Sequence, residues 1–185
     1  GKLTAARIAA GERLAASVME ELVPLKLDKA RFRVAVEPLG EDRAGSAGLD
    51  RVGFEIATNP GAPFGDLGAI ASGGELARFA LALKAALAGR AEGAQPLMIF
   101  DEVDQGVGGA VADAVGLRLK RLAAKAQVLV VTHSPQVAAR AEAHWRISKA
   151  GDGERVRTAV EVLSSADREE EIARMLAGAQ ITDAA

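Results

Sequence analysis

The sequence contains no cysteine and no tyrosine, and only two histidines occur among its 185 residues. The absence of cysteine excludes disulfides and thiolate metal sites, and two histidines, His133 and His144, leave little for a zinc site. No hydrophobic run is long enough to span a bilayer, and no signal peptide opens the sequence. We therefore expect a soluble, intracellular protein without a membrane partner.

Strong charge of either sign is also lacking. The formal net charge is −2, which gives no overall field that would attract nucleic acid. Any DNA contact must therefore be local, or be made by another part of a larger assembly. The hydrophobic share of 49% fits a globular α/β protein. A chain of this length is expected to form one domain that buries about 70% of its surface. Because it begins with Gly1, we expect an excised or processed piece.

The most informative stretch is an apolar run at residues 96–100 that ends in acidic residues. We interpret it as a fully buried strand of a parallel sheet, followed by Asp101 and Glu102. Neighbouring side chains on a strand point to opposite faces, so the two acids can serve different purposes. One carboxylate can hold a hard cation and the other can orient or deprotonate a water, as phosphoryl transfer requires. The alternative is a strand that enters a solvated acidic turn.

A second candidate site is the sequence Ser-Gly-Gly-Glu at residues 72–75, which opens a helix with apolar periodicity up to Leu87. Ser72 is a favourable N-cap residue. Free N–H groups at a helix start, two glycines and a hydroxyl together favour a bound phosphate. The alternative is a capped helix with a flexible lead-in.

A second apolar strand is predicted over residues 127–132, again fully buried, and it ends in His133. A helix predicted over 110–124 connects the two apolar strands. A strand–helix–strand unit of this length requires a parallel, right-handed connection. His133 should therefore emerge at the same edge of the sheet as Asp101 and Glu102, where it could contact a phosphate.

In the remaining segments, the spacing of apolar residues is typical of ordinary helices and strands. We predict a helix over 3–23, an antiparallel strand pair at 32–37 and 52–56, a hairpin at 144–149 and 155–162, and a last helix from Ser165 to Gly178. The acidic face of the last helix is expected to be solvated.

In this order, the four motifs resemble the second half of an ABC-type ATPase head. Ser72–Glu75 resembles the signature motif, Asp101-Glu102 the end of the Walker B strand, the glycine loop at 106–109 the D-loop, and Thr132-His133 the switch histidine. The residues of these motifs are similar to those of the RecN family of SMC-like bacterial DNA repair ATPases. The same is true of segment 171–176 near the end of the sequence. The implied fold is α/β, the C-terminal lobe of a P-loop NTPase head, with a mainly parallel sheet flanked by helices and antiparallel edge strands.

The resemblance also implies roles for individual residues. Asp101 would help to hold Mg²⁺, Glu102 would polarise the attacking water, and His133 would contact the γ-phosphate of ATP. Asp104 and the glycine loop would face a second protomer. The residues implied in binding the nucleotide held by that protomer are Ser72, Gly73, Gly74 and Glu75. RecN-like proteins usually have serine where this sequence has Gly108, so a hydroxyl contact there is missing.

One motif of such ATPases is absent. No Gly-x-x-x-x-Gly-Lys-Ser/Thr sequence occurs, so the chain lacks the phosphate-binding Walker A loop and its lysine. The resemblance places that loop in a separate N-terminal half. It implies that residues 1–24 are the root of a coiled-coil arm and that residues 25–185 are the C-terminal half of the head. The expected partners are the N-terminal half, a second protomer in an ATP-dependent homodimer, and DNA, and the expected location is the cytoplasm at the nucleoid. The isolated chain is expected not to hydrolyse ATP.

Two other function classes stay open. The chain could be an ATP-binding domain of another ABC-type ATPase, such as a transporter, although transporters usually have proline where Val103 follows Glu102. It could also be a non-enzymatic α/β interaction module.

Overall fold

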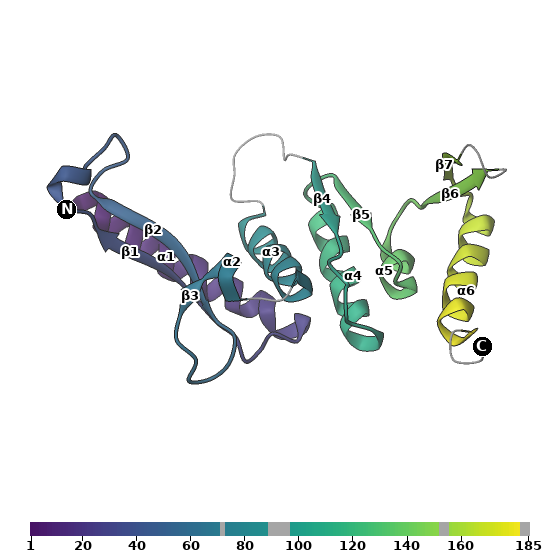
Figure 1. Ribbon diagram of the computed structural model, residues 1–185, viewed down its shortest axis with the longest axis horizontal. Helices are drawn as coiled ribbons and strands as arrows, with labels where there is room; N and C mark the ends of the chain where they lie inside the picture. The colour runs from purple at the N-terminus through teal and green to yellow at the C-terminus, as the bar shows by residue number, and fades with distance from the viewer. Residues whose placement is uncertain (71–72, 89–96, 152–155, 182–185) are drawn as a thin grey trace.

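The computed structural model describes residues 1–70, 73–88, 97–151 and 156–181. The molecule is elongated (Figure 1), with α1 and the β1–β2 pair at one end and α6 with the β6–β7 hairpin at the other. The described strands form three separate sheets, in the orders β1-β2-β3, β4-β5 and β6-β7. In the described part of the chain, no helix combines the length and the apolar character needed to cross a membrane.

The N-terminal part is a helix packed on an antiparallel sheet. Helix α1 (Lys2–Leu22) continues into a 3-10 turn, η1 (Val23–Leu25), and the sheet contains β1 (Arg31–Pro38), β2 (Asp50–Ala57) and the short β3 (Gly65–Asp66). A second 3-10 turn, η2 (Glu41–Arg43), lies between β1 and β2. The predicted helix and antiparallel pair are confirmed, with β1 and β2 in register from Arg31↔Ala57 to Pro38↔Asp50.

Helix α1 is part of the core and not a detached arm in this structure. Val18 and Leu22 are completely buried and belong to the same hydrophobic cluster as Phe32 of β1 and Phe79 of α3. At Gly11 an added Cβ would lie 2.9 Å from Cβ of Val34, which shows how closely helix and sheet approach. Residues on both sides of the predicted boundary at residue 24 thus contribute to one core, and both that boundary and the coiled-coil role of α1 stay predictions.

The middle of the chain holds the strand–helix–strand unit. It comprises α2 (Leu67–Ile70), α3 (Gly73–Leu87), β4 (Met98–Asp101), α4 (Gly109–Ala123), β5 (Val128–Val131) and α5 (Pro135–Arg140). Strands β4 and β5 pair in parallel, as predicted, from Met98↔Val128 to Asp101↔Val131. Among the described strands, only these two pair in parallel, and the other two sheets are antiparallel.

The prediction that β4 and β5 are fully buried is wrong. Phe100 is 5% exposed and packs in the core, and Met98, Val128 and Val130 lie against it. The opposite face of the same two strands is open, because Ile99 is 56% and Val131 is 49% exposed. An apolar composition of this kind is typical of strands that are buried on both faces. In the described part of the chain, helices cover only one face of β4 and β5.

The chain ends in a hairpin and a helix. Strands β6 (Trp145–Gly151) and β7 (Val156–Val162) pair antiparallel, as predicted, and α6 (Ser165–Ile181) continues three residues past the expected stop at Gly178. Their apolar side chains are also uncovered, with Trp145 55% and Val162 69% exposed.

The acidic face of α6 is not entirely solvated. Glu171 is 5% exposed, its carboxylate accepts hydrogen bonds from Arg174 at 2.5 and 2.9 Å, and Arg146 of β6 lies 3.7 Å away. Hydrogen bonding from Arg174 is the main cause that lowers the pKa of Glu171, and burial opposes it. This ion-pair cluster joins α6 to the hairpin.

We expect Glu171→Gln to lower the free energy of unfolding by about 1 kcal/mol at pH 7. Because the folded-state pKa is lowered, this contribution is present above the ordinary value of 4.5 and disappears as the pH falls through the lower folded-state pKa. Urea unfolding of both proteins at pH 7 and at pH 3 measures the effect. A difference that is the same at both values would contradict the ion-pair explanation.

The total exposed surface is large for the size of the chain. It amounts to 12038 Å², whereas a compact monomer of 19.1 kDa exposes about 8,400 Å². Relative to an unfolded chain, about 57% of the surface is buried rather than the expected 70% or so. The shortfall follows from the elongated shape and from the uncovered faces of β4–β5 and β6–β7.

Candidate nucleotide site

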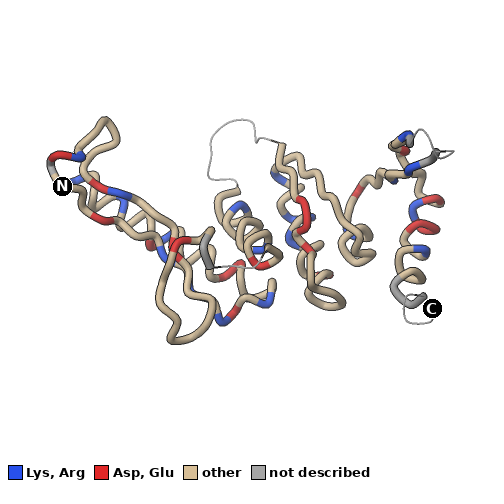
Figure 2. The backbone as a smooth tube through the Cα atoms, viewed as in Figure 1, with Lys and Arg blue, Asp and Glu red and all other residues tan. Residues whose placement is uncertain are grey.

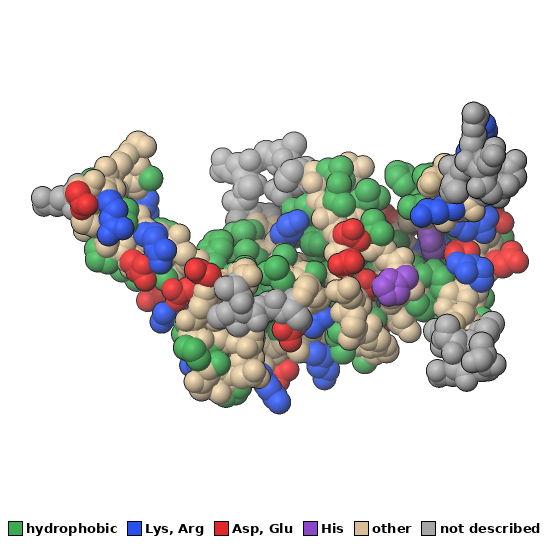
Figure 3. All heavy atoms as spheres, viewed as in Figure 1, with side chains coloured by type: hydrophobic (Ala, Val, Ile, Leu, Met, Phe, Trp, Pro, Cys, Tyr) green, Lys and Arg blue, Asp and Glu red, His purple; other side chains and the backbone are tan. Residues whose placement is uncertain are grey.

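The predicted convergence of the acids and the histidine is confirmed by the register of β4 and β5. Asp101 lies opposite Val131, so Glu102 and His133 both leave the parallel pair at its carboxyl edge. All three side chains are exposed. Figure 2 shows acidic residues where β4 ends, and Figure 3 shows hydrophobic side chains over the two strands with acidic and histidine side chains beside them. An exposed group of this kind is open to a ligand.

Glu102 adopts an unusual backbone conformation. Its φ angle is +56°, one of two positive values among the described non-glycine residues. This left-handed conformation costs about 1–2 kcal/mol for a residue with a side chain. It turns the chain sharply after β4, and Val103 next to it is completely buried. The acidic pair therefore sits on a turn that the core holds in place.

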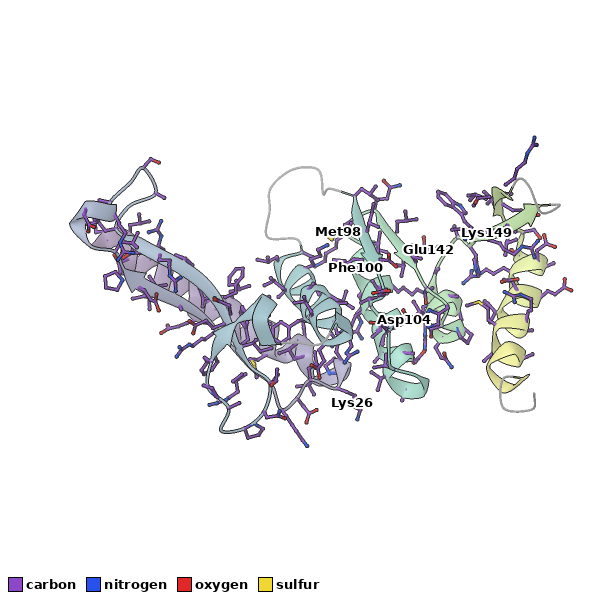
Figure 4. The ribbon with its side chains drawn as sticks, in the orientation of Figure 1. Lys26, Met98, Phe100, Asp104, Glu142 and Lys149 are labelled. Atoms are coloured by element: carbon purple, nitrogen blue, oxygen red, sulfur yellow. The ribbon has the colours of Figure 1, made fainter. Side chains whose placement is uncertain are left out.

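Asp104 lies inside the protein and not at an exposed edge. Figure 4 labels it beneath Phe100, where β4 ends. It is 2% exposed, and its Oδ2 accepts a hydrogen bond from the hydroxyl of Thr132. The resemblance implied that Asp104 faces a second protomer, whereas in this structure its carboxylate points inward.

The start of α3 forms a shallow cleft with the turn that follows the acids. Gly73, Gly74 and Glu75 line it together with Arg78, Gln105 and Gly106, and its volume is about 390 Å³. Ser72 lies outside the described residues. Burial lowers the pKa of the Arg78 guanidinium, and the charge of Glu75 partly offsets this. The cleft combines helix N–H groups with a cation, which suits an anionic ligand.

Gly74 is needed because α3 touches the turn directly. A Cβ at Gly74 would lie 2.6 Å from the carbonyl oxygen of Gln105, an atom of the main chain that also accepts a hydrogen bond from Arg78 at 3.4 Å. At Gly73 the nearest atom would be 3.5 Å away, at the end of the Gln105 side chain. The two neighbouring glycines thus offer a matched comparison.

We expect Gly74→Ala to lower the free energy of unfolding by about 1–3 kcal/mol, because the turn must move away from α3. Gly73→Ala should leave it unchanged or raise it slightly, since alanine favours helix. Urea unfolding midpoints of the two variants measure the difference. Equal midpoints would show that the contact between α3 and the turn is not tight.

The described residues contain no group of three or more His, Cys, Asp or Glu side chains placed to hold a metal ion. An exposed carboxylate at a strand end, such as Asp101, still fits Mg²⁺. This ion usually takes one or two carboxylates and completes its coordination with water and phosphate oxygens. A metal ion at Asp101 would therefore need water or phosphate oxygens to complete its coordination.

The glycine loop leads into α4 with Gly108 as N-cap, and its φ of −144° is an extended conformation open to any residue. Apart from its chain neighbours, no atom of the described residues lies within 4 Å of a Cβ placed there, so a serine would fit.

Two residues of the site had no assigned role in the sequence analysis. Thr132 was named only as the strand-end residue before His133, and Arg78 was not singled out. The structure brings each of them into the site by a hydrogen bond: Thr132 donates to Asp104, and Arg78 donates to the carbonyl group of Gln105. The sequence signal for Arg78 is weak: it is one turn from Glu75 and adjoins the apolar Phe79.

This sequence is similar to those of known DNA repair proteins. DNA repair protein RecN of Rickettsia bellii is 44% identical over 182 residues, and those of Xylella fastidiosa strain 9a5c and Streptomyces coelicolor are 42% and 43% identical. These alignments cover 98–99% of this chain but only 32–33% of each relative. The chain thus spans about a third of the length of the curated relatives it matches. No protein-family model matches it.

Solved structures agree on the fold. An Smc head domain with coiled coil and joint from Pyrococcus yayanosii matches with a TM-score of 0.64 at 24% identity, covering 88% of this chain and 29% of that one. A structure from work on ATP-driven dimerisation and DNA-stimulated activation of SMC ATPases matches with a TM-score of 0.57 at 21% identity, covering 94% and 96%. The chain therefore has the α/β fold of an SMC ATPase head and belongs to the RecN family, as the counterpart of the C-terminal third of its members.

Proposed function

We propose that this chain is the C-terminal part of an SMC-like ATPase head that acts in the repair of DNA double-strand breaks and in recombination. The proposal depends above all on one observation, the shared strand edge at which Asp101, Glu102 and His133 are all exposed. The similarity to RecN proteins supports the role in DNA repair. A bacterial cytoplasm, at the nucleoid, is the corresponding location.

The proposed chemistry is hydrolysis of ATP. Asp101 would hold Mg²⁺, which neutralises charge on the phosphate oxygens when bound. Glu102, exposed on its turn, would orient the attacking water and accept its proton. His133 would donate a hydrogen bond to the γ-phosphate. Asp101 is the last residue of β4 and Glu102 lies on the left-handed turn that follows, so the two acids would serve the metal and the water separately.

The cleft at the start of α3 would act in trans. Ser72, Gly73, Gly74 and Glu75 would bind the γ-phosphate of a nucleotide held by a second protomer. The free N–H groups of the first helical turn and Arg78 suit this purpose. Two heads are then needed for hydrolysis, and ATP would drive homodimerisation.

The N-terminal part of the head would cover the open faces of the sheets. Leu97, Ile99, Leu129 and Val131 form one exposed apolar face on β4 and β5. Trp145, Ile147, Val160 and Val162 form another on the β6–β7 hairpin. Surfaces of this kind on a soluble protein mark an interface. The partner we propose is the segment that carries the Walker A loop, which this sequence lacks.

The test compares the chain alone with the chain reconstituted with the N-terminal region of its full-length protein. We expect no measurable Mg²⁺-dependent ATP hydrolysis by the chain alone. The reconstituted head should hydrolyse ATP at a rate per head that rises with protein concentration, and should form dimers with ATP in light scattering. Robust turnover by the isolated chain, or a reconstituted head that ATP neither dimerises nor protects, would contradict the proposal.

A further inference from the structure

The buried carboxylate of Asp104 has few partners. Its Oδ2 accepts one hydrogen bond, from the Thr132 hydroxyl, and its Oδ1 is buried without a hydrogen-bond partner in the described part of the chain. A buried carboxyl group with a single hydrogen-bond donor is unfavourable for stability. We therefore look for a role of Asp104 in positioning neighbouring residues, because its burial does not favour the stability of the fold.

The Thr132 hydroxyl transmits this contact to the histidine segment. While it donates to Asp104, its oxygen accepts the N–H of Ser134 at 2.9 Å. Ser134 is 8% exposed, and its own hydroxyl donates to Oε1 of Gln136 at 3.0 Å. His133 lies between these two fixed residues and is itself exposed. Its backbone is thus held on both sides while its ring stays free for a ligand.

Asp104 also belongs to the turn that carries Glu102. The N–H of Gln105 donates to the carbonyl group of Glu102 at 3.0 Å, and the N–H of Val107 donates to that of Asp104 at 3.3 Å. The first of these two overlapping turns begins at Glu102, the residue with the positive φ. The bond between Asp104 and Thr132 therefore connects the Glu102 turn directly to the His133 segment.

We propose that Asp104 and Thr132 form a bridge across the ends of β4 and β5 that fixes the position of Glu102 relative to His133. The inference rests on the proposed ATPase function and assigns both as positioning residues that act through their neighbours. Asp104 then has an internal role, in place of the contact with a second protomer that the resemblance implied. Misplacing a reacting group by about 1 Å can slow a reaction up to about 100-fold, so such a bridge can control turnover.

The first test uses the full-length protein. Thr132→Val removes the hydroxyl at nearly constant shape, and Thr132→Ser keeps it. We expect Thr132→Val to lower kcat for ATP by about tenfold with KM changed less than twofold, and Thr132→Ser to stay within about twofold of the wild type. Adding Asp104→Asn to Thr132→Val should lower kcat little further, because both changes break one contact. An unchanged kcat in Thr132→Val, or a loss that serine does not restore, would overturn the bridge.

The second test does not depend on ATP hydrolysis. The chain has only two histidines, so NMR signals of the His133 ring can be followed with His144 as an internal reference. Thr132→Val should shift or broaden the His133 signals alone, and Thr132→Ser should leave them in place. Unmoved His133 signals in Thr132→Val would overturn the bridge whatever the ATPase result. Inactive wild-type protein with His133 signals that move as expected would overturn the ATPase proposal and leave the bridge supported.

Discussion

Replacing Glu102 with Gln in the full-length protein is expected to lower ATP turnover by at least about 100-fold and to let ATP-bound dimers accumulate. Glutamine has nearly the size and shape of glutamate, so the turn after β4 can keep its conformation. It cannot accept a proton from the attacking water. Binding of ATP should change less than twofold, because the proposed contacts to the phosphates come from other residues.

The measurement combines steady-state hydrolysis, ATP affinity and light scattering with ATP. The matched control is Glu142→Gln, which removes a charge from an exposed glutamate between α5 and β6 (Figure 4) and should leave all three quantities unchanged. If Glu102→Gln weakened ATP binding as much as turnover, Glu102 would have a structural role, and its strained backbone would be the explanation.

The sequence predicted where the site residues meet because chain topology decides it. A strand–helix–strand unit leaves few possible arrangements, so the parallel pairing of β4 with β5 brings Glu102 and His133 to one edge. This inference needs only two apolar runs and the helix between them. The α/β class and the order of elements follow from the same periodicities.

Exposure and side-chain direction could not be predicted in the same way. The apolar run of β4 indicates that both faces of the strand suit burial. It does not tell whether the same chain provides elements that pack on both faces, and Ile99 remains exposed. Asp104 and Glu171 were read as surface acids, and both are almost completely buried. Asp104 has its partner Thr132 in a distant segment, and Glu171 has Arg146 there in addition to its neighbour Arg174 on the same helix. Sequence spacing carries no information about the distant pairs.

A substitution at Ile99 tests whether the N-terminal region packs on the open face of β4 and β5. On β4 it lies opposite Leu129 of β5, on the face that no helix of the described chain covers. We expect Ile99→Glu to leave the unfolding free energy of the isolated chain within about 0.5 kcal/mol of the wild type, because an exposed side chain loses little packing. Assembly with the N-terminal region should fail, since the interface loses about 1.5–3 kcal/mol of apolar burial and gains a buried charge.

The assay measures capture of the chain by the separately expressed N-terminal region, and then ATP hydrolysis by the mixture. We expect affinity to fall at least about tenfold and turnover to fall with it. Leu49→Glu is the control, because Leu49 is similarly exposed, at 53%, but precedes β2, which lies at one end of the elongated molecule and away from β4 and β5 (Figure 1). If Ile99→Glu assembled as well as the control, the open face of β4 and β5 would not be the docking site. Loss of assembly in both variants would instead indicate that any added acidic residue disturbs the complex, because Leu49 precedes β2 and Ile99 lies on β4, and these strands belong to separate sheets.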